Sequence, residues 1–264
     1  MSALQAVLWD VDGTLAETER DGHRVAFNQA FEALGLPWRW DVDRYGELLR
    51  ITGGRERLLH DMSTRTDAPV VPGEREALAR ALHARKNAIF GELVRGGGLP
   101  LREGVLALMD ECGERGVRMG IATTTSRVNV EALLGTHLGP RWQERFATVV
   151  CGEDVRLKKP DPEVYRIALQ ALGITPLEAV AIEDSPGGVA AARAAGVPVA
   201  VTRSVYFGDA AIEGAIAIGP GLHERAGWRP ALRPAAGTAS ALVGLDDLQA
   251  WCALGDTVSE FGPA

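Results

Sequence analysis

The chain has 264 residues, 46% of them hydrophobic, which is enough to bury one large core together with a smaller module. Its formal net charge of −7 excludes a broad nucleic-acid surface, so any anion site must be a local cluster of basic groups. The three cysteines are widely spaced and form neither a metal-ligand pattern nor an even disulfide set, which is typical of a reducing cytoplasm. Since we find no secretory signal and no membrane-spanning apolar run, we expect a cytoplasmic protein without a membrane partner.

Short apolar runs alternate with amphipathic stretches of helical period along most of the chain. The predicted strands, in chain order, are 6–9, 119–123, 148–151, 179–182, 197–201 and 215–218. The predicted helices between them are 104–115, 128–134, 162–172 and 187–195. This alternation is typical of an α/β fold with a doubly wound parallel sheet and helices on both faces.

Residues 18–96 interrupt this alternation with long polar helical patterns and no convincing strand. We interpret them as an all-helical cap domain inserted into an α/β core formed by 1–17 and 97–264. The glycine-rich stretch RGGGLPL at 95–101 has the flexible backbone that a hinge between the two requires. The end of the core, 220–264, is predicted to be a C-terminal extension that includes a short docking helix in LDDLQAWCAL.

Two carboxylates, Asp10 and Asp12, directly follow the first predicted strand in the stretch LWDVDGTL. Asp-Gly is a hairpin signal, and Asp-x-Asp also opens a calcium loop. A helical pattern rather than a second strand follows Gly13, and the glycine and glutamate of a calcium loop are not at the required positions. The pair therefore indicates a functional site.

Polar side chains follow three further predicted strands in the same way. They are Thr123, Thr124 and Thr125 after the second strand, Lys159 after the third, and Glu183 and Asp184 after the fourth. Because ligands bind beyond the carboxyl ends of parallel strands, we expect all of these groups to share one rim with Asp10 and Asp12. Taken alone, the threonine run is also typical of an ordinary helix cap, and Lys158 is interpreted as a solvated charge.

Gathering these carboxylates requires a cation, because two unit charges about 4 Å apart repel by roughly 4 kcal/mol at an effective dielectric near 20. An all-oxygen site of this kind favours Mg²⁺ together with a substrate phosphate oxygen. The lysine would offset the charge that builds up at phosphorus during transfer. One carboxylate can then attack phosphorus while a second protonates the leaving oxygen, which predicts an aspartyl-phosphate intermediate.

These stretches resemble the four signature motifs of the haloacid dehalogenase superfamily, in its phosphatase branch with a helical cap. The motifs DVDGT, the threonine after the second strand, KPDP and EDS occur in the family's order. The resemblance implies that Asp10 is the nucleophile, that Asp12 is the general acid and base, and that Lys159 is the motif lysine, with Thr123 as the motif threonine. It also implies that Asp10, the Asp12 backbone carbonyl and Asp184 bind Mg²⁺, with Glu183 as a further candidate ligand.

A narrower resemblance, carried by ITGGRERLLH, IATTTSRVNVEALL and AIEDSPGGVAAARAAG, covers nearly the whole chain. It is to the xylulose-1,5-bisphosphate phosphatases encoded beside Calvin-cycle genes, and it implies a small phosphorylated sugar as substrate. The implied substrate-binding residues are Glu19, Thr52, Gly53, Gly54, Arg55, Arg57, Thr124, Thr125 and Asn129, with the cap loop holding the distal phosphate. The role of His23 stays open because the spacing in ERDGHR departs from the family pattern.

Alternatives to these assignments stay open at this point. A phosphomutase of the β-phosphoglucomutase type and a phosphoglycolate phosphatase-like hydrolase would use the same core residues. A non-catalytic phosphate sensor is disfavoured because it needs no acid such as Asp12. Arg55 and Arg57 could instead form an ordinary charged helix face, and Trp38 and Trp40 are expected to pack the cap. We expect a monomer.

Overall fold

The computed structural model describes residues 4–232 and 240–259, and every statement below refers to these. Its described strands form one parallel sheet in the order β3-β2-β1-β4-β5-β6. They are β1 (Ala6–Trp9), β2 (Arg118–Ala122), β3 (Thr148–Val150), β4 (Ala179–Glu183), β5 (Val199–Thr202) and β6 (Ala217–Gly219). Central β1 pairs with both β2 and β4, which brings Trp9 level with Ile121 and Ile182. The predicted parallel sheet is confirmed, with strand ends shifted slightly.

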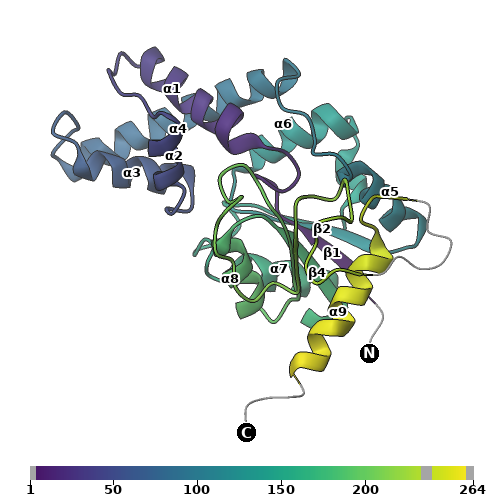
Figure 1. Cartoon of the computed structure of the whole chain (residues 1–264). Coiled ribbons are helices and arrows are strands. Elements are labelled where there is room, and N and C mark those ends of the chain that lie inside the picture. The colour runs from purple at the N-terminus through teal and green to yellow at the C-terminus, as the bar shows by residue number, and fades with distance from the viewer. Residues whose placement is uncertain (1–3, 233–239, 260–264) are drawn as a thin grey trace, which may run out of the picture.

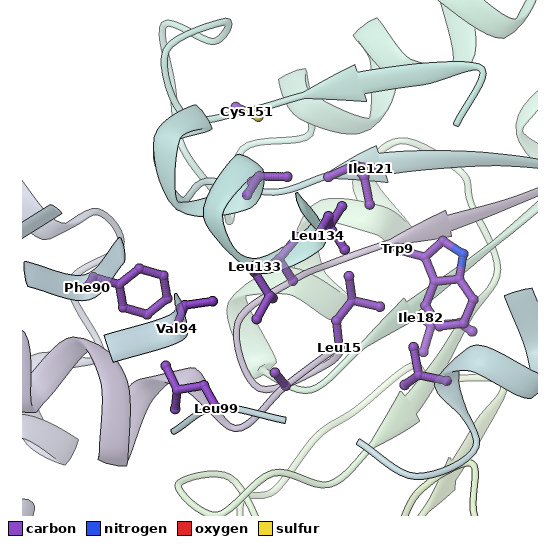
Figure 2. Packing of buried hydrophobic residues seen from close by; sticks show 14 of the residues in the cluster. Trp9, Leu15, Phe90, Val94, Leu99, Ile121, Leu133, Leu134, Cys151 and Ile182 are labelled. Carbon is purple, nitrogen blue, oxygen red and sulfur yellow. The ribbon is translucent and has the colours of Figure 1, made fainter. Parts of the chain in front are cut away.

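Helices cover both faces of this sheet, as a doubly wound fold requires (Figure 1). They are α5 (Val105–Glu114), α6 (Arg127–Leu138), α7 (Glu163–Leu172), α8 (Pro186–Ala194) and α9 (Leu245–Ser259). Successive side chains of a strand point to opposite faces, so Trp9 joins the apolar cluster with α5 and α6, and Leu8 joins the cluster with α7 and α8. Figure 2 shows the first cluster, in which Trp9, Ile121 and Leu133 are buried together.

Residues 17–104, all of which the structure describes, contain helices and no strand. These are the π-helical turn η1 (Glu19–His23), α1 (Arg24–Ala33), α2 (Val42–Leu48), α3 (Gly54–Thr64) and α4 (Pro72–Arg95). Figure 1 shows them gathered to one side of the sheet. Trp38 and Trp40 pack here against Phe31, with ring centroids 5.7 and 5.0 Å away. The helical insertion is therefore present, while the cap boundaries at 18 and 96 stay a prediction.

The two chain segments that join these helices to the sheet run side by side. Ala16 forms an antiparallel bridge with Leu101, and the backbone of Arg102 donates a hydrogen bond of 2.8 Å to the carbonyl of Leu15. This arrangement places the start and the end of the helical insertion at one point near the carboxyl end of β1.

The described part of the C-terminal extension docks on the core. Helix α9 contacts α5, and the ring of Trp251 stacks on Trp228 with centroids 4.5 Å apart. Residues 1–3, 233–239 and 260–264 of the predicted core lie outside the described residues. Within the described ranges, no helix combines the length and the apolar character that crossing a membrane requires.

Candidate active site

A cavity of about 340 Å³ lies between the carboxyl ends of the strands and the helical insertion; we refer to it as the main cavity. The core contributes Asp10, Asp12, Thr123, Thr124, Thr125, Asn129, Lys159 and Asp184 to its wall. The insertion contributes Glu19, His23, Thr52, Gly53, Gly54, Arg57 and Lys86. The structure thus brings together most of the predicted site residues, which come from both parts of the chain.

Lys159 lies at the centre of the site and bonds to two of its carboxylates. Its Nζ donates hydrogen bonds of 2.7 Å to Asp10 Oδ1, 2.6 Å to Glu183 Oε1 and 2.8 Å to the carbonyl of Ala122. Burial alone would lower the pKa of Lys159, but the charges of Asp10 and Glu183 raise it above its usual range. The lysine is therefore a permanent cation beside Asp10.

The pKa of Asp10 is raised toward neutral pH. Burial and the neighbouring charge of Glu183 raise its pKa to about 7, against the opposing effect of Lys159. One lysine therefore does not fully compensate the carboxylates around it, and the site needs more positive charge to keep Asp10 ionised.

Glu183 is fully buried and faces inward from the end of β4. Its Oε1 accepts a second hydrogen bond, of 2.6 Å, from the hydroxyl of Tyr165. A side chain at Gly188 would collide with its carboxylate, since a Cβ there would lie 1.9 Å from Oε2. Glu183 is thus fixed by its neighbours, with Oε1 shared between Lys159 and Tyr165.

The donor set fits a magnesium ion. Carboxylate oxygens of Asp10, Glu183 and Asp184 lie within 4.8 Å of one another, and hard oxygen ligands are those that Mg²⁺ prefers. Burial, Asp10 and Glu183 raise the pKa of Asp184 well above its usual range, as expected for buried carboxylates crowded together. Gly13, at φ 81°, leaves the approach to Asp184 open, because a Cβ there would lie 2.0 Å from Oδ2.

The side chain of Asp12 is not part of this group of three carboxylates, and it contacts residues of the chain segment that leads into the insertion. Its Oδ1 lies 2.8 Å from His23 Nε2 and accepts a hydrogen bond of 2.5 Å from Thr18 Oγ1. Burial would raise the pKa of Asp12, but His23 and Thr18 lower it below its usual range. His23, whose role the sequence left open, therefore contacts Asp12, and its ring packs 4.1 Å from that of Phe90.

Glu19 and Arg57 form a buried network on the insertion side of the main cavity. Tyr45 donates a hydrogen bond of 2.5 Å to Glu19 Oε2, and Arg57 Nη1 donates one of 2.8 Å to the Tyr45 hydroxyl. Arg55 is placed differently: its side chain is 44% exposed, and Nη1 lies 3.1 Å from Glu76 Oε1. Arg55 lines a neighbouring side cavity rather than the main cavity.

The threonine run turns inward at the start of α6. Thr123 is buried, and its Oγ1 accepts a hydrogen bond of 3.3 Å from the backbone of Thr125. The N-cap residue of α6, Ser126, makes no side-chain capping bond, so the structure does not use it as an ordinary cap. Asn129 donates to Thr125 Oγ1 and to Asn87 Oδ1 of α4, at 3.3 and 3.2 Å, and thus links the core to the insertion.

Lys86 is a cavity residue that sequence analysis missed. It is buried in α4, and its Nζ lies 5.2 Å from the ring centroids of both Phe27 and Phe90. Burial lowers its pKa to about 8, although Asp12 and Glu19 act in the opposite direction. The signal was present, because Leu82, Lys86 and Phe90 recur at the four-residue spacing of one helix face.

The comparisons with known proteins agree with this geometry. A family model described as a hydrolase, haloacid dehalogenase-like hydrolase, matches residues 4–196. The chain belongs to the haloacid dehalogenase-like hydrolase family. Within this family it is similar to protein CbbY of Cupriavidus necator, with 42% identity over 248 residues, which are 94% of this chain and 96% of that protein. The chain is thus a phosphatase of the haloacid dehalogenase family, as its sequence predicted.

Two solved structures of CbbY from Rhodobacter sphaeroides are similar in fold to this chain, each with a TM-score of 0.75. One is a complex with phosphate, 41% identical, covering 80% of this chain and 92% of that chain. The other is the D10N mutant in complex with xylulose-(1,5)bisphosphate, 40% identical, with the same coverage of both chains.

Proposed function

We propose that this haloacid dehalogenase-family phosphatase depends on Mg²⁺ and hydrolyses a small sugar bisphosphate, with xylulose 1,5-bisphosphate as the first candidate. The observation that carries the proposal is Lys159 bridging Asp10 and Glu183 beside Asp184, at the floor of a cavity that the insertion covers. The complex of a CbbY relative with xylulose-(1,5)bisphosphate supports the choice of substrate. We further propose a cytoplasmic monomer.

In this proposal Asp10 is the nucleophile. Its carboxylate attacks the substrate phosphorus, the bond from phosphorus to the sugar oxygen breaks, and a phosphoaspartate forms. Asp10, Asp184 and the Asp12 backbone carbonyl would hold Mg²⁺, which when bound neutralises the carboxylates and the phosphate oxygens. Lys159 stays next to Asp10 and offsets charge on the transferred group. Thr123 and Thr124 would donate hydrogen bonds to its oxygens.

Asp12 is the proposed acid and base. Thr18 and His23 both contact Oδ1 of Asp12, so Oδ2 is the oxygen proposed to exchange a proton with the substrate. His23 and Thr18 hold the pKa of Asp12 below its usual range in the free enzyme, so the acid role requires that Asp12 takes up a proton when the substrate binds. It gives this proton to the leaving sugar oxygen, then accepts one from the water that attacks the phosphoaspartate.

Glu183 has a positioning role in this mechanism, because Lys159 and Tyr165 share its Oε1. The sugar and its second phosphate are proposed to bind residues of both parts of the chain: Glu19, Thr52, Gly53, Gly54 and Arg57 of the insertion, and Thr125 and Asn129 of the core. Thr124 is assigned to the transferred phosphate. Arg55 is left out of this group because its guanidinium faces Glu76. Lys86 adds positive charge to the same cavity.

The test is release of inorganic phosphate from a panel of sugar phosphates, including xylulose 1,5-bisphosphate, with and without Mg²⁺. We expect Mg²⁺-dependent release with the highest kcat/KM for a bisphosphate. Conversion to an isomeric sugar phosphate without free phosphate would identify a mutase instead. Preference for a small acid such as phosphoglycolate would contradict the substrate class.

A further inference from the structure

Lys158, which the sequence suggests to be a solvated charge, makes a specific contact between the core and the insertion. It lies in the segment between β3 and α7, and its Nζ donates a hydrogen bond of 2.9 Å to Glu56 Oε2 in the first turn of α3. The side chain of Lys158 is only 24% exposed, and that of Glu56 is 36% exposed. The ammonium is therefore held at the boundary between the two parts of the molecule.

The same ammonium lies directly against the backbone of Gly53. A Cβ on Gly53 would come within 2.5 Å of Lys158 Nζ and 2.3 Å of Glu56 Oε2. Gly53 also has φ 97°, a conformation that other residues rarely adopt. The backbone conformation at this position therefore favours glycine, and the lack of a side chain lets the Lys158 ammonium pack on the loop formed by Thr52, Gly53 and Gly54.

Lys158 and this loop line the main cavity together. The buried cations of the cavity have other partners: Lys159 binds Asp10 and Glu183, and Arg57 binds Tyr45 and the carbonyl of Leu48. Lys86 packs against the rings of Phe27 and Phe90. Among the described residues, the ion-pair partner of Lys158 is the half-exposed Glu56. Ion pairs that water reaches are weak, so a phosphate dianion in the cavity can take the ammonium from Glu56.

We propose that Lys158 is the residue that selects substrates with a second phosphate group, exchanging Glu56 for that phosphate above Gly53. This inference rests on the proposed phosphatase function and adds a named specificity residue to it. Because Lys158 directly precedes Lys159 in the chain, one tight segment would place one cation at each of the two phosphates.

The test compares Lys158→Met with the wild type on xylulose 1,5-bisphosphate, xylulose 5-phosphate and p-nitrophenyl phosphate. We expect KM for the bisphosphate to rise about tenfold or more, as for loss of a hydrogen bond to a charged group, with kcat little changed. Both monophosphates should keep their kinetic constants. Lys158→Arg should restore part of the preference, and Arg156→Met, which removes a charge from the same loop, is the matched control.

Glu56→Gln distinguishes phosphate binding by Lys158 from a purely structural role of the Lys158–Glu56 ion pair. If Glu56 only holds Lys158 until substrate arrives, this variant keeps or improves the preference for the bisphosphate. A loss equal to that of Lys158→Met would show that the bridge itself matters and would overturn the inference. So would equal effects of Lys158→Met on bisphosphate and monophosphates. Failure of the wild type to hydrolyse any phosphate ester would instead overturn the proposed function, and the inference with it.

Discussion

Lys159 Nζ lies 2.6 Å from Glu183 Oε1, which does not line the main cavity, and 2.7 Å from Asp10 Oδ1, which does. Glu183 has no exposed surface and cannot approach a substrate while it holds this position. We therefore assign Glu183 the role of holding the Lys159 ammonium in position. This relationship distinguishes Glu183 from Asp184, although the two are neighbours in sequence.

Glu183→Gln is expected to lower kcat by about tenfold or more while KM changes little, because the lysine loses a charged anchor that is worth roughly 1.5–3 kcal/mol. Steady-state phosphate release measures the effect. Tyr165→Phe removes the other bond to the same oxygen and serves as the matched control, with a smaller loss. A rise in KM at constant kcat would contradict the positioning role.

Asp10→Asn is expected to abolish turnover, because an amide cannot attack phosphorus. The melting temperature should stay the same or rise, since the change removes one of three crowded carboxylates and keeps an acceptor for Lys159. Phosphate release and thermal unfolding, measured on the same preparation, check both parts. Residual turnover near the wild-type rate would refute Asp10 as the nucleophile.

Asp12→Ala is expected to slow hydrolysis of sugar phosphates by about 100-fold or more, the usual contribution of a general acid. Turnover of p-nitrophenyl phosphate should fall much less, because nitrophenolate leaves without a proton. Thr18→Val, which removes one hydrogen bond to Asp12 Oδ1, should show a weaker form of the same selectivity. Equal slowing of both substrates would count against the acid role.

The sequence predicted that Asp10, Lys159 and Asp184 lie together, because the carboxyl ends of parallel strands meet at one edge of the sheet, and the structure places all three in one cavity. The parallel sheet could be predicted because each buried strand is a short apolar run, which can be recognised in the sequence without knowing its partners. The strand ends in the structure differ from the predicted ones, because a strand ends where its hydrogen bonds to the neighbouring strand end, and the apolar pattern does not show that point. Thr202, for example, extends β5 because it pairs with Gly219.

The insertion was less predictable, since its site residues depend on how helices pack. Lys86 and Arg55 are both basic residues in polar helices, yet Lys86 is buried in the main cavity and Arg55 pairs with Glu76 outside it. Lys158 was undervalued for a related reason: its partner, Glu56, is 102 positions away in sequence. Local patterns carry no information about such long-range pairs.

Magnesium is expected to stabilise the protein by binding the folded state alone. At 100 times its dissociation constant it would add about 2.7 kcal/mol, or a melting-temperature rise of roughly 5 °C or more. Asp184→Asn should remove most of this rise, and EDTA should reverse it in the wild type. Thermal unfolding with and without Mg²⁺ is the measurement, with Asp209→Asn as an exposed control. An unchanged shift in Asp184→Asn would place the metal elsewhere.

Lys86 is expected to reduce stability while aiding function. Burial lowers its pKa from 10.5 to about 8, so below pH 8 its charge costs folding free energy, and the cost disappears as the pH rises toward 10.5. At pH 7, Lys86→Met should therefore raise the melting temperature by about 3 °C or more, yet lower kcat/KM for sugar phosphates. Arg85→Met, at an exposed neighbour, should do neither.

The pH profile tests the same lysine by a second route. In the wild type, kcat/KM for a sugar phosphate should fall as the pH passes about 8, because the cavity loses the Lys86 cation. Lys86→Arg keeps a charge throughout this range, so the decline should move to higher pH even if the rate at pH 7 is lower. A profile that falls at the same pH in both proteins would assign the ionisation to another group.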